Sequence, residues 1–219
     1  MQIIKSFFYV LIYIALLNLL RSWVFLAYTP ESLFILEYYD LINGLLLFFF
    51  LFLFTYMSNN ENEKLPQSTA IKWYLIAVAI GALFVFVQWP LNLIYNCISV
   101  QQFVISYDFT GWDNFMNVNI LSSILFIPIA EELFFRQFLQ RKLHKKMNAT
   151  KAIISSALLF SFLHFLYFDF IYFEFYYHFH HAYITLFGGL LLALVYYKSK
   201  SIGPPIALHM AWNIMVYIV

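Results

Sequence analysis

The sequence predicts an all-α fold, a polytopic bundle of about seven transmembrane helices, and three observations lead to it. Of the 219 residues, 63% are hydrophobic and only 11% are charged, whereas a soluble domain needs roughly a quarter of its residues charged to cover its surface. The 27 Phe and 17 Tyr add aromatic area that a soluble surface does not hide. The apolar runs are long and continuous, which favours helices over the alternating strands of a barrel.

Seven stretches approach the length of a membrane span, which is about 20 mostly apolar residues. They are residues 6–28, 33–57, 71–89, 117–138, 151–170, 179–197 and 203–219. The first is predicted to be a span or an anchor and not a cleavable signal, because Arg21 follows the apolar run without a small-residue cleavage site. We expect Arg21 itself to extend its side chain to a membrane interface.

The distribution of charge predicts an N-terminus in the cytoplasm and a C-terminus outside. The basic residues then placed on the cytoplasmic side are Lys5, Lys64, Lys72, Arg141, Lys142, Lys145, Lys146, Lys151, Lys198 and Lys200. The acidic residues placed on the opposite side are Glu31, Asp108, Asp113, Asp169 and Glu174. This is the positive-inside asymmetry of membrane proteins.

Charge and cysteine content exclude several other classes of protein. The net charge is +1 and the basic residues are scattered, so nucleic acid is not an expected partner. The single cysteine, Cys97, excludes an internal disulfide framework and a cysteine-based zinc site. The expected partners are the lipid bilayer and a peptide or membrane-protein substrate, and the oligomeric state does not follow from the sequence.

Charged residues interrupt the fourth apolar stretch, where each costs roughly 2.5–3.5 kcal/mol at the bilayer centre. Glu132 and Arg136 are four residues apart, so they share a helix face and are expected to pair. Glu131 points about 100° away from that face, which predicts one structural carboxylate and one available carboxylate. Pro128, just before them, is expected to kink the helix.

Two further apolar stretches carry His164 and the pair His209 and Asn213, whose spacing of four also gives a shared face. Burying this set is costly unless the side chains meet around a wet pocket. A carboxylate and a histidine there can activate water as a general base, and a His and an Asn can donate to an oxyanion. The same Glu and His residues can also bind zinc, and the residue types allow both readings.

Three patterns in these stretches resemble the motifs of the CPBP family, also called the Abi family, of CAAX prenyl proteases and bacteriocin-processing enzymes. Glu131, Glu132 and Arg136 match its Glu-Glu-x-x-x-Arg motif; Phe160 and His164 match Phe-x-x-x-His; His209 and Asn213 match His-x-x-x-Asn. The resemblance divides the chain into residues 1–115, transmembrane helices of unassigned role, and residues 116–219, a catalytic helical core.

The resemblance implies an intramembrane endopeptidase with a cytoplasm-facing cavity. In it Glu131 and His164 activate water, His209 and Asn213 form the oxyanion site, and Glu132, Arg136 and Phe160 support them. We expect no cofactor, because Asn is an uncommon zinc ligand; a zinc enzyme would use Glu131, His164 and His209. The expected substrate is a small peptide or a membrane protein in a bacterial cell membrane, with a role in bacteriocin or peptide maturation or in self-immunity.

Two other functions remain as alternatives. A non-catalytic regulator or immunity protein of the same fold would act by binding, and a proton or ion transporter would tend to show paired repeats in two halves. Outside the motifs, His178, His180 and His181 are expected to belong to an aromatic and His-rich interface belt. Gly188 and Gly189 are expected to permit close helix packing.

Overall fold

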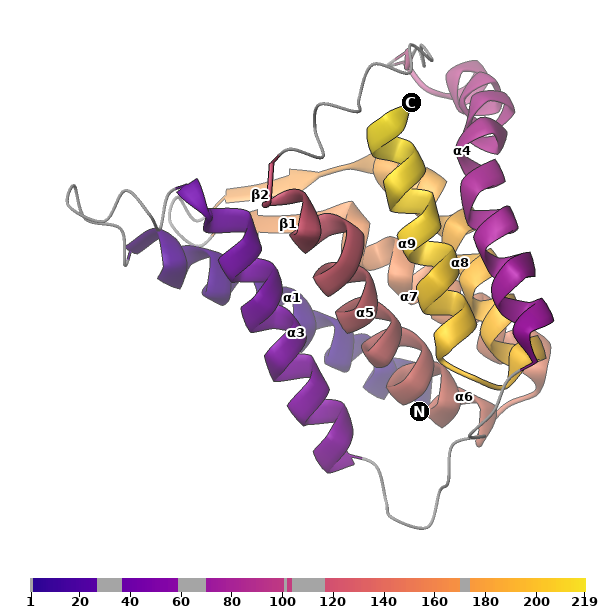
Figure 1. The fold of residues 1–219 in the computed structure, drawn as a ribbon, viewed down its shortest axis with the longest axis horizontal. Coiled ribbons are helices and arrows are strands. Elements are labelled where there is room, and N and C mark those ends of the chain that lie inside the picture. The colour runs from indigo at the N-terminus through magenta and orange to yellow at the C-terminus, as the bar shows by residue number, and fades with distance from the viewer. Residues whose placement is uncertain (1, 27–36, 59–69, 101, 104–116, 170–173) are drawn as a thin grey trace.

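The structure, a computed structural model, describes residues 2–26, 37–58, 70–100, 102–103, 117–169 and 174–219. These residues form a helical bundle with one short hairpin (Figure 1). The N-terminal half supplies α1 (Gln2–Leu26), α3 (Tyr39–Ser58) and α4 (Ile71–Ile98). In Figure 1, α1 and α3 lie on one side of the central helix labelled α5, and α9 and α4 lie on the other side.

The central helix is continuous over residues 120–144 and contains two π-helical stretches. It consists of η2 (Ser122–Phe126), α5 (Ile127–Glu132), η3 (Leu133–Gln140) and α6 (Arg141–His144), of which η2 and η3 are π-helical. Pro128 lies in the first turn of α5 and does not end the helix. Wider π turns inside an α-helix frequently mark functional sites, and here they flank the two adjacent glutamates.

The remaining elements follow from local signals. The Asn148 side chain accepts a hydrogen bond from Lys151 N at 3.0 Å and so caps α7 (Ala149–Phe165). Strands β1 (Leu166–Asp169) and β2 (Glu174–Tyr177) form an antiparallel hairpin that leads into α8 (Phe179–Ser199). Lys200 adopts the left-handed conformation (φ 54°) after α8, and two prolines open α9 (Gly203–Ile218).

Two helix pairs make the most extensive contacts in the bundle, α7 with α8 and α4 with α9. The glycines of α8 allow close packing of α8 on its neighbours, as the sequence predicts. A Cβ atom at Gly189 would lie 3.1 Å from Cδ1 of Phe160, and one at Gly188 would collide with the ring of Trp212. These two glycines therefore bring α8 against two aromatic side chains of α7 and α9.

The all-α membrane fold is confirmed. Within the described residues, four helices are long and apolar enough to cross a membrane, over Ile3–Ser22, Tyr39–Ser58, Ile71–Ile98 and Phe179–Ser199. Large apolar side chains cover their outer faces, such as Leu75 at 66% exposed and Leu83 at 62%, which is the surface that lipid solvates. That the other three predicted spans cross a membrane stays a prediction.

Several boundaries differ from those predicted. The predicted span 151–170 ends as a helix at Phe165, because its last residues pair with Glu174–Tyr177 as a strand. The predicted span 71–89 continues to Ile98 with Pro90 inside it, and 117–138 continues into the basic residues of α6. Residues 33–36, together with Glu31, Lys64, Asp108 and Asp113 of the charge argument, lie outside the described residues.

Candidate active site

The Glu132–Arg136 pair expected from the sequence is present and fully buried. Arg136 Nε donates to Glu132 Oε2 at 2.9 Å, and both side chains are 0% exposed. Arg136 Nη1 also donates to the Ser156 hydroxyl on α7 at 2.9 Å. A buried guanidinium is stable only with such partners, so the pair joins the central helix to α7.

His209 extends this network across to α9. Its Nδ1 lies 3.1 Å from Glu132 Oε1, and its Nε2 lies 3.8 Å from Glu131 Oε2. Because Glu132 accepts at Nδ1, the imidazole is held in one orientation with Nε2 towards Glu131. His164 was the histidine expected beside Glu131; among the described residues, the ion pair of Glu131 is with His209.

The two glutamates therefore differ, as their positions on the helix predict. Both oxygens of Glu132 are bound, one by Arg136 and one by His209. Glu131, 5% exposed, has the longer contact to His209 and lines a cavity. Glu131 is thus the carboxylate that an entering molecule can reach.

Phe160 connects the histidines to the buried arginine. It is 0% exposed, its ring centroid lies 5.1 Å from Arg136 Cζ, and it meets the His209 ring edge-on at 5.9 Å. Its backbone oxygen lies 2.9 Å from His164 Nδ1. If Nδ1 donates to this oxygen, Nε2 is the acceptor nitrogen of His164. The four-residue spacing of Phe160 and His164 therefore fixes the orientation of the His164 ring.

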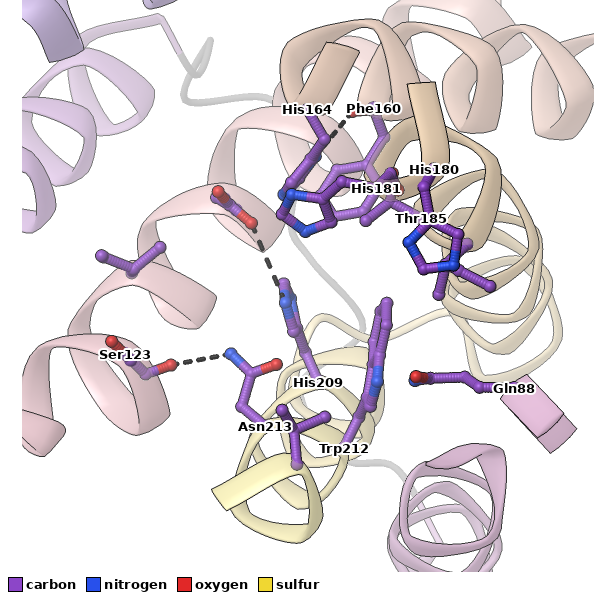
Figure 2. Close-up of a pocket in the computed structure, with 14 residues that line it drawn as sticks. Gln88, Ser123, Phe160, His164, His180, His181, Thr185, His209, Trp212 and Asn213 are labelled. Atoms are coloured by element: carbon purple, nitrogen blue, oxygen red, sulfur yellow. Dashed lines mark hydrogen bonds and ion pairs between the residues drawn. The ribbon is translucent and has the colours of Figure 1, made fainter. Parts of the chain in front are cut away.

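Asn213 lies one turn beyond His209 and binds the central helix. Its Nδ2 donates to the backbone oxygen of Ser123 in η2 at 2.7 Å (Figure 2). One N–H of the amide is thereby used to fix the side chain, and the second remains for another acceptor. The π-helical turn and Asn213 thus orient each other.

A cavity of about 380 Å³ collects these side chains (Figure 2). The four predicted catalytic residues and Phe160 line it, whereas Glu132 and Arg136 are not among its lining residues. Its polar and aromatic lining residues are Gln88, Ser123, Glu131, Phe160, His164, His180, His181, Thr185, His209, Trp212 and Asn213. The three motif-bearing segments therefore converge on one space, which the sequence could only propose.

Several of these residues were not selected from the sequence. Trp212 and Gln88 are cavity-lining residues without a motif, and Ser156 carries no signal beyond its place in an apolar run. His180 and His181, expected in an interface belt, line the cavity, and the His181 ring lies 5.0 Å from that of His164. His180 Nε2 also hydrogen-bonds Asn92 Oδ1 at 2.6 Å, which holds α8 to α4.

The arrangement of possible metal ligands is the next feature of the site. Among the described residues, no group of three or more His, Cys, Asp or Glu side chains is arranged to hold a metal ion. Glu131, His164 and His209, the alternative zinc ligands, share a cavity but do not form such a group. Both ring nitrogens of His209 face carboxylates instead.

Comparison with known proteins identifies the part of the chain that carries the site. No curated protein and no solved structure matches the chain. A family model described as type II CAAX prenyl endopeptidase Rce1-like matches residues 113–215, which contain all three motifs. That family is a family of membrane proteases. Over residues 113–215 the chain is therefore similar to the Rce1-like proteases, and the three motifs lie within that stretch.

Proposed function

We propose that this protein is an intramembrane endopeptidase that hydrolyses a peptide bond with water activated by Glu131. The proposal depends on one observation above all. Glu131 faces the cavity at the point where the three motif-bearing helices meet, while Glu132 is fully engaged by Arg136 and His209. A general base must be within reach of the proton that it takes, directly or through one water.

The reaction uses the residues as follows. Glu131 takes a proton from water, and the oxygen attacks the substrate carbonyl carbon. The resulting oxyanion accepts hydrogen bonds from the Asn213 amide and from Nε2–H of His209 in its imidazolium form, in which both ring nitrogens carry a proton. Each such preorganised donor is worth about 3–4 kcal/mol. When the C–N bond breaks, the proton held by Glu131 passes to the leaving amine. His164, with its acceptor nitrogen in the same cavity, positions the water.

The supporting network has a distinct task. Ser156 holds Arg136, Arg136 holds Glu132, Glu132 holds His209, and His209 faces Glu131. Each polar group in this series is buried, so its geometry does not depend on solvent. Preorganised groups of this kind need no rearrangement during the reaction, which is where their catalytic benefit arises.

The substrate class is proposed from the surroundings of the site. The cavity lies among apolar helices, so the substrate is a small peptide or a membrane protein, and bacteriocin or peptide maturation or self-immunity is the corresponding role. The alternative, a regulator that acts by binding, requires the same fold but not the reactivity of Glu131.

The test compares new peptide termini in membranes from cells that make the wild type or Glu131→Gln. Glu174→Gln is the matched control, since it removes an exposed carboxylate outside the cavity. We expect defined termini with the wild type and the control and none with Glu131→Gln. Identical termini in all three samples would reject the proposal and leave the binding function.

A further inference from the structure

A second cavity lies on the other side of the catalytic residues. It has a volume of about 320 Å³ and shares Glu131, His164, His181 and Ile127 with the first cavity. Glu131 and His164 therefore lie where the two spaces adjoin. A peptide bond at that position has room for further residues in both directions, which is the arrangement that an endopeptidase needs.

The outer wall of this second cavity comes from α1, which lies outside the family match. Ile14, Leu17, Asn18 and Arg21 line it, and their spacing places them on one face of the helix. Asn18 is 2% exposed, and its Nδ2 donates to Ile14 O at 2.8 Å. The Tyr39 hydroxyl of α3 donates to Arg21 O at 3.0 Å, so this end of α1 is held in place.

Arg21 gives the second cavity a cationic side chain. Arg21, expected from the sequence to reach a membrane interface, lines the cavity that contains Glu131. His178 and His181 are the other basic side chains of this wall, and Glu131 is its only acid among the described residues. A guanidinium presents five donors in a planar fork that matches a carboxylate.

We propose that the α1 cavity binds the part of the substrate on one side of the cleaved bond and that Arg21 recognises a carboxylate there. The carboxylate is either an acidic side chain or the free C-terminus of the substrate. This inference rests on the proposed protease function and assigns a role to the first helix of the chain. Specificity then comes from α1, while the chemistry comes from residues 113–215.

The first test uses the wild type in detergent with a proteome-derived peptide library and identifies the cut sites by mass spectrometry. We expect a carboxylate at a fixed distance from the cut bond to raise kcat/KM by about 10- to 100-fold, as one charge-assisted contact does. Synthetic peptides then separate the two sources. Asp or Glu is replaced by Asn or Gln in one arm, and the C-terminus is amidated in the other.

The second test uses substitutions of Arg21. Arg21→Lys retains the preference, Arg21→Gln loses it, and Arg21→Glu changes it to Lys or Arg at the same position. An arginine that only supports Glu131 would instead lower the turnover of all peptides by a similar factor. A wild type that cuts no peptide contradicts the protease function, whereas cutting without any carboxylate preference contradicts only the role of Arg21.

Discussion

Glu131 and Glu132 are adjacent in the sequence, yet their surroundings assign them different tasks. Glu132 lies between a guanidinium and an imidazole, with 0% of its side chain exposed. Among the described residues, Glu131 makes the longer 3.8 Å contact with His209 and faces a cavity. The difference arises because successive residues of a helix point about 100° apart.

The two glutamates should therefore differ in their contribution to stability. Glu132→Gln leaves Arg136 buried without a counter-charge, so we expect the free energy of unfolding to fall by about 3–5 kcal/mol. Glu131→Gln should change it by less than about 1 kcal/mol, because His209 keeps its contact with Glu132 and loss of the buried Glu131 charge removes a desolvation cost. Thermal unfolding in one detergent measures both. Equal losses would contradict the assignment of Glu132 as the structural member.

The donor geometry also leads to a prediction about metal ions. His209 has a carboxylate at each ring nitrogen, and His164 Nδ1 faces a backbone oxygen. We expect peptide cleavage to persist after treatment with a strong zinc chelator and dialysis. A zinc-dependent peptidase that is treated in parallel is the control for chelation. Loss of activity that added zinc restores would assign the alternative role to Glu131, His164 and His209.

At the scale of the elements, α8 packs closely on α7 and α9 because two adjacent residues lack side chains. Gly188 lies against the ring of Trp212, which is itself edge-on to Phe84 of α4 at 4.8 Å. The Trp212 ring also stacks on His209 at 5.8 Å. A change in the position of α8 is therefore transmitted to a side chain of the active site.

Gly188→Ala should reduce both stability and activity. The added methyl group collides with the indole, and overpacking of this kind costs about 1–3 kcal/mol. We expect a lower midpoint of thermal unfolding and slower cleavage, because Trp212 and His209 move together. Leu194→Ala is the control on the same helix, since Leu194 is 43% exposed. An unchanged midpoint of thermal unfolding in Gly188→Ala would contradict the tight packing of α8 against Trp212, because α8 would then have moved to accommodate the methyl group.

At the scale of the whole molecule, the candidate active site lies towards the hairpin end of the bundle. His164 is in the last turn of α7, His181 is in the first turn of α8, and Asn213 is in the second half of α9. The basic residues of α6 lie at the far end of the central helix. The positive-inside rule then places the cavity near the outer face, whereas the family resemblance implies a cytoplasmic opening.

Labelling of single cysteines in intact cells distinguishes these orientations. Cys97 is first replaced by Ser, and Cys is then introduced at Lys146 or at Glu174. From the charge distribution we expect a membrane-impermeant maleimide to label Glu174→Cys in intact cells and Lys146→Cys only after permeabilisation. The reverse pattern would place the site at the cytoplasmic face and make this chain an exception to the positive-inside rule.

The sequence by itself determined the membrane class and the all-α fold, and it selected Glu131, His164, His209 and Asn213 as candidate site residues. Composition leaves no soluble alternative, and charged residues inside apolar runs are too costly to be accidental, so Glu131, Glu132 and Arg136 stand out. Helical periodicity also predicted the Glu132–Arg136 pair, because both residues belong to one helix. The hairpin after Phe165 was missed, because a short apolar strand and the end of an apolar helix have the same pattern.

Only the tertiary structure decided which groups meet between helices. It paired Glu131 with His209, placed Phe160 over Arg136, added Ser156 and Trp212, and brought Arg21 of α1 to a cavity beside Glu131. Residues 21 and 131 are far apart in the sequence, and no periodicity relates them. Contacts of this kind depend on how helices pack, and packing is set by the fit of many side chains at once.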